Sequence, residues 1–99
     1  MRVRYTPRSR RDLEAIYSYI DQQNPAAARS VKRAIQRAIE FLAEFPHIGT
    51  VTDRSPEFRG MRAGRYPYRV YYRVRGDEVW IVHIRDMRSE EHTSELQSQ

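Results

Sequence analysis

Arginine is the residue type in this sequence that is best placed to do chemistry. The chain of 99 residues carries 18 basic side chains, all of them arginine except Lys32, and a formal net charge of +5. A guanidinium is always charged, and its planar fork of donors fits a phosphate or a carboxylate. A GC-rich genome also raises the arginine count, but the bias indicates a nucleic acid or an acidic protein as partner.

Several of these arginines gather in the second half of the chain, at Arg59, Arg62, Arg65, Arg69, Arg73 and Arg85. Arginines on a strand often form only its solvated face. Here Arg69, Tyr71 and Arg73 alternate, so cationic and aromatic groups share one face, which favours a binding surface. Its ligand is expected to be nucleic-acid phosphate or an acidic protein segment. The predicted binding residues are Arg59, Arg65, Arg69, Tyr71, Arg73, His83 and Arg85.

Histidine is the other candidate for chemistry. His47, His83 and His92 lack the spacing of metal ligands, and the chain has no cysteine, so we expect no metal and no cofactor. His83 lies inside a strand-like stretch, where it could exchange protons near neutral pH. Its place beside Val79 and Ile81 also allows an ordinary histidine with its hydrogen bonds satisfied.

The composition excludes a membrane protein. No run approaches the roughly 20 apolar residues that a bilayer-crossing helix needs. The sequence opens with alternating polar and apolar residues at Met1–Arg4, which is unlike a secretory signal. We therefore expect a cytoplasmic protein without membrane contact.

Two helices are predicted in the first half of the chain, after a short strand over residues 2–6. Thr6-Pro7 and Asn24-Pro25 each combine a capping side chain with a proline at the first helical position. Apolar residues recur at helical spacing over residues 8–22 and again from Pro25 to Phe45. Because the connection is so short, the helices must form an antiparallel hairpin.

Three strand-like stretches follow, at residues 58–61, 66–74 and 78–84, with a hairpin turn at Arg75-Gly76-Asp77. Simple alternation puts Trp80, Val82 and Ile84 on one face of the last strand, and Val79, Ile81, His83 and Arg85 on the other. The predicted fold class is α+β, with the order β-α-α-β-β-β. The helical hairpin covers one face of a small antiparallel sheet, in which the last three strands form a meander. The other face is left to bind a partner.

The C-terminal residues have a different origin. Arg88 to Ser98 reads as the in-frame translation of a sequencing-library adapter, and this polar stretch has no periodic apolar face. We therefore treat residues 1–87 as one domain and residues 88–99 as a non-native tail.

The order of these elements and four sequence segments resemble the RelE/ParE toxin superfamily of type II toxin–antitoxin systems over residues 1–87. The segments are Asp12–Ile20, Asn24–Ala28, Phe45–Gly49 and Tyr66–Val74. The resemblance implies a RelE/ParE-like fold and a cognate antitoxin that binds the toxin in a hetero-oligomer. In the RelE-like branch the target is mRNA on the ribosome, which is cleaved, whereas ParE-like members inhibit DNA gyrase and are not nucleases.

The resemblance is closer to the ParE branch. Arg69 matches a phosphate-binding arginine of the nuclease branch, and Arg85 resembles a second one. Where that branch places a histidine or tyrosine after the last strand, this chain has Met87 and Arg88, which cannot exchange protons near neutral pH. We therefore expect a gyrase inhibitor that is not an enzyme. One alternative is a ribosome-dependent mRNA endonuclease using Arg69, His83 and Arg85, and the other is a non-toxic nucleic-acid-binding module.

Overall fold

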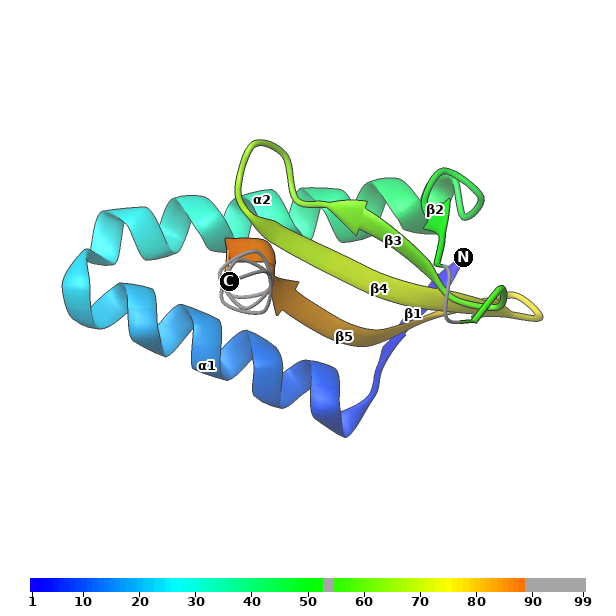
Figure 1. Cartoon of the computed structure of the whole chain (residues 1–99), viewed down its shortest axis with the longest axis horizontal. Helices are drawn as coiled ribbons and strands as arrows, with labels where there is room; N and C mark the ends of the chain where they lie inside the picture. Colours follow the sequence, from blue (N-terminus) through cyan, green and yellow to red (C-terminus); the bar gives the residue numbers. More distant parts are fainter. Residues whose placement is uncertain (53–54, 89–99) are drawn as a thin grey trace, which may run out of the picture.

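The computed structural model describes residues 1–52 and 55–88 (Figure 1). The predicted non-native tail, apart from Arg88, lies outside the described residues. The elements follow one another as β1 (Arg2–Tyr5), α1 (Pro7–Gln23), α2 (Pro25–Glu44), β2 (Thr50–Val51), β3 (Arg59–Arg62), β4 (Tyr68–Arg75) and β5 (Glu78–Asp86). This order confirms the predicted α+β class and adds the short strand β2.

Side-chain caps set the ends of both helices. The Thr6 hydroxyl accepts a hydrogen bond from the Ser9 amide at 3.1 Å, one turn into α1. Asn24 both ends α1 and begins α2, because its amide donates to the Ile20 carbonyl at 2.7 Å while its side chain accepts from the Ala27 amide at 3.1 Å. A single residue therefore closes the hairpin, as predicted.

Within the described residues, the strands form a five-stranded sheet in the order β1-β5-β4-β3-β2. β3, β4 and β5 pair as the predicted antiparallel meander, and Gly76 in the β4–β5 turn has the expected positive φ of 59°. The expectation of an all-antiparallel sheet is wrong, because β1 pairs with β5 in parallel. The helical hairpin returns the chain to the sheet, and the two reversals of the β3–β4–β5 meander leave β5 running in the direction of β1.

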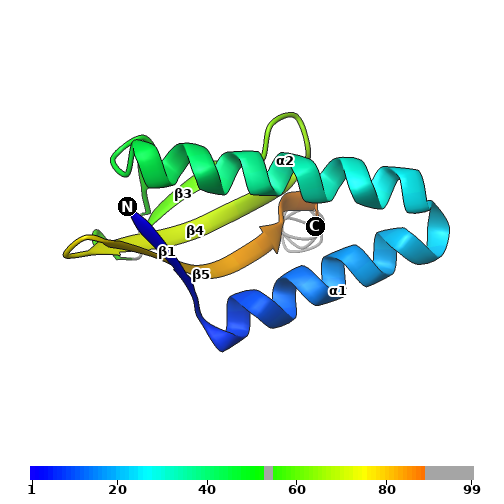
Figure 2. The ribbon, with the colours of Figure 1, turned by 180° about the vertical axis from the view of Figure 1, so that it is seen from behind.

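One face of the sheet forms the core against α2. Figure 2, seen from behind, shows α2 in front of β3 and β4, whereas α1 lies alongside β5. The core consists mainly of α2 residues Val31, Ile35, Ala38, Ile39 and Leu42, packed on Val70, Tyr72, Val79, Ile81 and Ile84 of the sheet. The apolar face of α1 is only half-buried, and Ser9 is its one buried residue. The second helix therefore supplies most of the apolar contact with the sheet.

A β-bulge in β5 overturns part of the predicted face assignment. Tyr71 pairs with His83 but the next residue, Tyr72, pairs with Ile81, so β5 has one extra residue at this point. Ile84, 3% exposed, consequently lies in the core rather than with Trp80. His83 and Arg85 therefore lie on the other face of the sheet, together with Trp80. A strict period of two residues cannot register an inserted residue, which is why simple alternation failed beyond Val82.

Tyr72 connects the sheet to the loop after α2. Its side chain is 0% exposed, and its hydroxyl accepts from the Gly49 amide at 2.9 Å and donates to the Pro46 carbonyl at 2.9 Å. A Cβ on Gly49 would lie 2.5 Å from that hydroxyl, so the close approach requires glycine. This contact holds the loop on the core.

The first prediction concerns this hydroxyl. Tyr72→Phe leaves the buried Gly49 amide without its acceptor, and we expect the free energy of unfolding to fall by about 1–3 kcal/mol in urea titrations. Tyr19→Phe is the matched control, because Tyr19 is 58% exposed and its variant should match the parent. Equal stability of the two variants would contradict the role of Tyr72.

The second prediction concerns Tyr17 on α1. Burial, and secondarily the neighbouring Tyr5, raise the pKa of Tyr17 from 10.0 to about 12. Because the folded state favours the neutral phenol, this stabilisation is present below pH 10 and is lost as the pH rises toward 12. Urea titrations across that interval should show stability declining more steeply in the parent than in Tyr17→Phe. Identical pH profiles for the two proteins would argue against it.

Candidate binding site on the open sheet face

The face of β3, β4 and β5 that points away from α2 is called here the open face. It carries Arg69, Tyr71, Arg73, Trp80, His83 and Arg85, all of them partly exposed. In Figure 1 this face is turned toward the viewer, with α2 behind the sheet. The bulge is what brings His83 and Arg85 onto the same face as Arg69 and Tyr71.

Three side chains on this face are stacked in a row. The His83 and Tyr71 rings lie nearly parallel, with an angle of 16° and centroids 5.8 Å apart. The Arg69 guanidinium lies 5.7 Å from the Tyr71 centroid. These are ordinary separations for stacking and for a cation over a ring, and they restrict the orientation of each side chain.

Asp12 of α1 anchors one end of this row. One of its carboxylate oxygens lies 2.6 Å from His83 Nδ1, and it also accepts from the Ile84 amide at 3.1 Å. β1 stops at Tyr5, so α1 supplies the partners along the next part of this β5 edge. Directly after β1, the Thr6 hydroxyl donates to the Val82 carbonyl of β5 at 3.2 Å. Asp12 therefore replaces a missing strand partner and orients His83.

Arg69 at the other end lies flat over Gly60 of β3. A Cβ on Gly60 would clash with Arg69 Nε, so only glycine leaves room for the guanidinium in this position. That Nε is buried and has no hydrogen-bond partner in the part of the chain that the structure describes, and Nη2 reaches the Gly60 carbonyl only at 3.5 Å. The group is confined by its surroundings but poorly satisfied as a donor.

The other predicted binding residues fall into different environments. Arg73 shares the open face, where it lies 3.9 Å from Glu57 and 5.8 Å from the Phe58 ring. Arg59 points to the core side and donates to the carbonyls of His47 and Gly49, which ties down the loop. Arg65 lies between β3 and β4, with its guanidinium 5.7 Å from the Tyr66 ring. The structure thus gathers Arg69, Tyr71, Arg73, His83 and Arg85 and separates Arg59 and Arg65 from them.

Sequence reasoning missed Asp12 and Gly60. Asp12 lies 71 positions from His83 in the chain, so no local pattern links the two residues. Gly60 reads as an ordinary strand residue until the register places it opposite Tyr71, beside Arg69. Asp12 does open the first segment of the family resemblance, which was the available signal.

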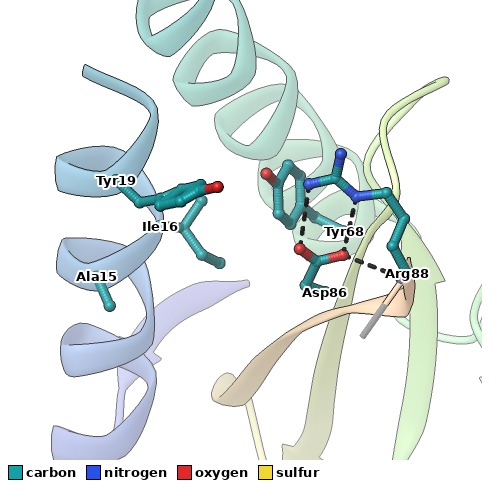
Figure 3. A pocket seen from close by; sticks show the side chains of 6 residues that line it. All are labelled: Ala15, Ile16, Tyr19, Tyr68, Asp86 and Arg88. Carbon is teal, nitrogen blue, oxygen red and sulfur yellow. Dashed lines mark hydrogen bonds and ion pairs between the residues drawn. The ribbon is translucent and has the colours of Figure 1, made fainter. Parts of the chain in front are cut away.

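A shallow hollow of about 420 Å³ lies between α1 and the end of β5 (Figure 3). Its lining residues are Ala15, Ile16, Tyr19, Tyr68, Asp86 and Arg88. Figure 3 shows Tyr19 pointing from α1 toward Tyr68, with the Asp86–Arg88 ion pair beside it. Burial raises the pKa of Tyr68 in this wall. Arg88, which belongs to the predicted non-native tail, forms one side of the hollow.

Residues 1–52 and 55–88 contain neither a metal-binding cluster nor a membrane-spanning helix. No group of three or more histidine and acidic side chains there is arranged to hold a metal ion. No helix in the same residues combines the length and apolar character that crossing a bilayer requires.

Comparison with known proteins defines the family. The model for the ParE toxin of the type II toxin–antitoxin system parDE matches residues 3–90. A protein of Sinorhizobium fredii (strain NBRC 101917 / NGR234) described as "Putative toxin Y4kP" is 36% identical over 76 residues, which cover 77% of this chain and 78% of the relative. A chain from the chromosomal ParDE TA system of P. aeruginosa superposes with a TM-score of 0.75 at 25% identity, covering 87% of this chain and 95% of that one.

The fold and these similarities define a toxin of a type II toxin–antitoxin system. More narrowly, the chain belongs to the ParE toxin family.

The third prediction tests the role of Asp12. Asp12→Ala removes the acceptor of the Ile84 amide, so we expect faster hydrogen exchange at that amide and a loss of about 1–3 kcal/mol in stability. Glu14→Ala, an exposed change on the same helix, should leave both quantities unchanged. Slow exchange at Ile84 in Asp12→Ala would show that another group protects the strand edge.

Proposed function

We propose that this ParE-family toxin inhibits DNA gyrase and is neutralised by a cognate antitoxin that binds the open face. The observation that carries the proposal is the family match, which spans almost the whole described chain. The resemblance to the ParE branch implies gyrase as target. The structural neighbour belongs to a ParDE system, which supports an antitoxin partner for this chain as well.

The side chains of the open face support its assignment as the antitoxin-binding site. Tyr71, Trp80 and the stem of Arg69 offer partly exposed aromatic and aliphatic surface between cationic groups. Such a mixture suits an amphipathic protein segment, which buries apolar side chains and pairs acidic ones. No helix in the described part of the chain lies across this face, so a partner segment has access to it.

The second candidate function is ribosome-dependent mRNA cleavage. One observation favours it, because the bulge places His83 on the same face as Arg69 and Arg85, and Asp12 holds the imidazole in place. Cations near an oriented histidine are elements of phosphodiester cleavage. Against it, Met87 and Arg88 stand where the nuclease branch has a proton-exchanging side chain.

The fourth prediction separates these functions. Induction of the chain should arrest growth, and co-expression of the product of the adjacent reading frame should restore it. The purified chain should block supercoiling by gyrase and trap cleaved gyrase–DNA complexes, with His83→Ala as active as the parent. Primer extension on cellular mRNA provides the opposing readout. Codon-phased cuts that disappear in His83→Ala, with normal supercoiling, would replace the gyrase proposal with the nuclease.

A further inference from the structure

We propose that Arg69 is a preformed receptor for one carboxylate side chain of the antitoxin, and that Gly60, Tyr71 and Asp12 are the residues that position it. The inference rests on the proposed neutralisation by an antitoxin and names the chemistry of that contact. It assigns roles to Gly60 and Asp12, which were not among the predicted binding residues.

The first step is that Arg69 lacks an acidic partner within the described residues. Its contacts there are the Tyr71 ring at 5.7 Å and the Gly60 carbonyl at 3.5 Å, at the limit of a hydrogen bond. Its Nε has no hydrogen-bond partner among those residues. Because that Nε is buried, a ligand would reach the guanidinium at its terminal nitrogens, from which a carboxylate can accept two parallel hydrogen bonds.

The second step is that the side chain is held in position before any ligand arrives. Gly60 pairs directly with Tyr71 across β3 and β4, and the guanidinium occupies the space that a side chain at Gly60 would fill. Tyr71 is fixed in turn by stacking on His83, which Asp12 anchors from α1. Because ordering of a long side chain opposes binding, this arrangement lowers the entropic cost of association.

The third step is that the face suits a single carboxylate rather than a nucleic-acid strand. A strand requires several cations along its phosphates. The neighbouring cations already have partners: Arg62 donates to the carbonyls of Tyr66 and Arg65, and Arg73 faces Glu57. His83 faces Asp12. An amphipathic acidic segment, with one carboxylate at Arg69 and apolar side chains near Trp80, fits this distribution of charge.

The fifth prediction uses the complex of the full chain with its cognate antitoxin. We expect Arg69→Ala to raise the dissociation rate roughly tenfold or more, because it removes one partner of a charged hydrogen-bonded pair. Arg69→Lys should also raise it, since a lysine keeps the charge but loses the planar fork. Gly60→Ala should have a similar effect although it leaves the arginine in the chain, because the new methyl group displaces the guanidinium.

Arg29→Ala is the matched control. It removes the same charge from an exposed site on α2 and should change the rate by less than about twofold. Thermal unfolding of each free variant distinguishes loss of the contact from loss of the fold. The partner is identified by replacing each antitoxin Asp or Glu with its amide. The replacement at the residue that contacts Arg69 should raise the dissociation rate of the parent complex but not that of the Arg69→Ala complex.

The outcomes separate this inference from the function on which it rests. A stable complex whose dissociation is unchanged by Arg69→Ala and Gly60→Ala overturns the carboxylate receptor and leaves neutralisation intact. Failure to form any complex overturns both. If single-stranded RNA binding depends on Arg69 while the antitoxin complex does not, the ligand is phosphate and the inference is wrong.

Discussion

The pairing of β5 on both of its edges is the constraint on which the rest of the structure depends. β4 holds one edge along its whole length, whereas the other edge is shared by β1, the Thr6 hydroxyl and the Asp12 carboxylate. Because α1 supplies the last of these partners, its position is tied to the strand edge as well as to the core. A modest apolar contact therefore suffices to place a helix whose apolar face is only half-buried.

The bulge in β5 determines what the two faces present. One extra residue returns Ile84 to the core and turns His83 outward, toward Tyr71. Without it, the core would contain an imidazole and the open face would lose one end of its stacked row. A local irregularity in hydrogen bonding thus produces both a dry core and a polar binding surface, which is a common use of bulges near functional sites.

The sequence was sufficient where local signals decide the structure. Thr6 and Asn24 predicted both helix starts, the apolar spacing predicted the α2 core stripe, and Gly76 predicted the hairpin turn. It was insufficient where the outcome depends on distant pairing. β2 has only two residues and no pattern of its own, and the direction of β1 depends on the path of the helical hairpin. The contacts of Asp12 with His83 and of Gly60 with Arg69 exist only in the folded register, so the arginines, Tyr71 and His83 were predicted without the residues that position them.

Asn24 restricts the length of the connection between α1 and α2. Because the same residue terminates one helix and caps the next, the corner between them contains no spare chain. A residue inserted after Asn24 would either extend α2 and turn its apolar stripe by about 100°, or separate the cap from the Ala27 amide. Natural insertions and deletions should therefore be rare at this corner, and length variation in relatives should concentrate at the opposite end of the molecule, between α2 and β3.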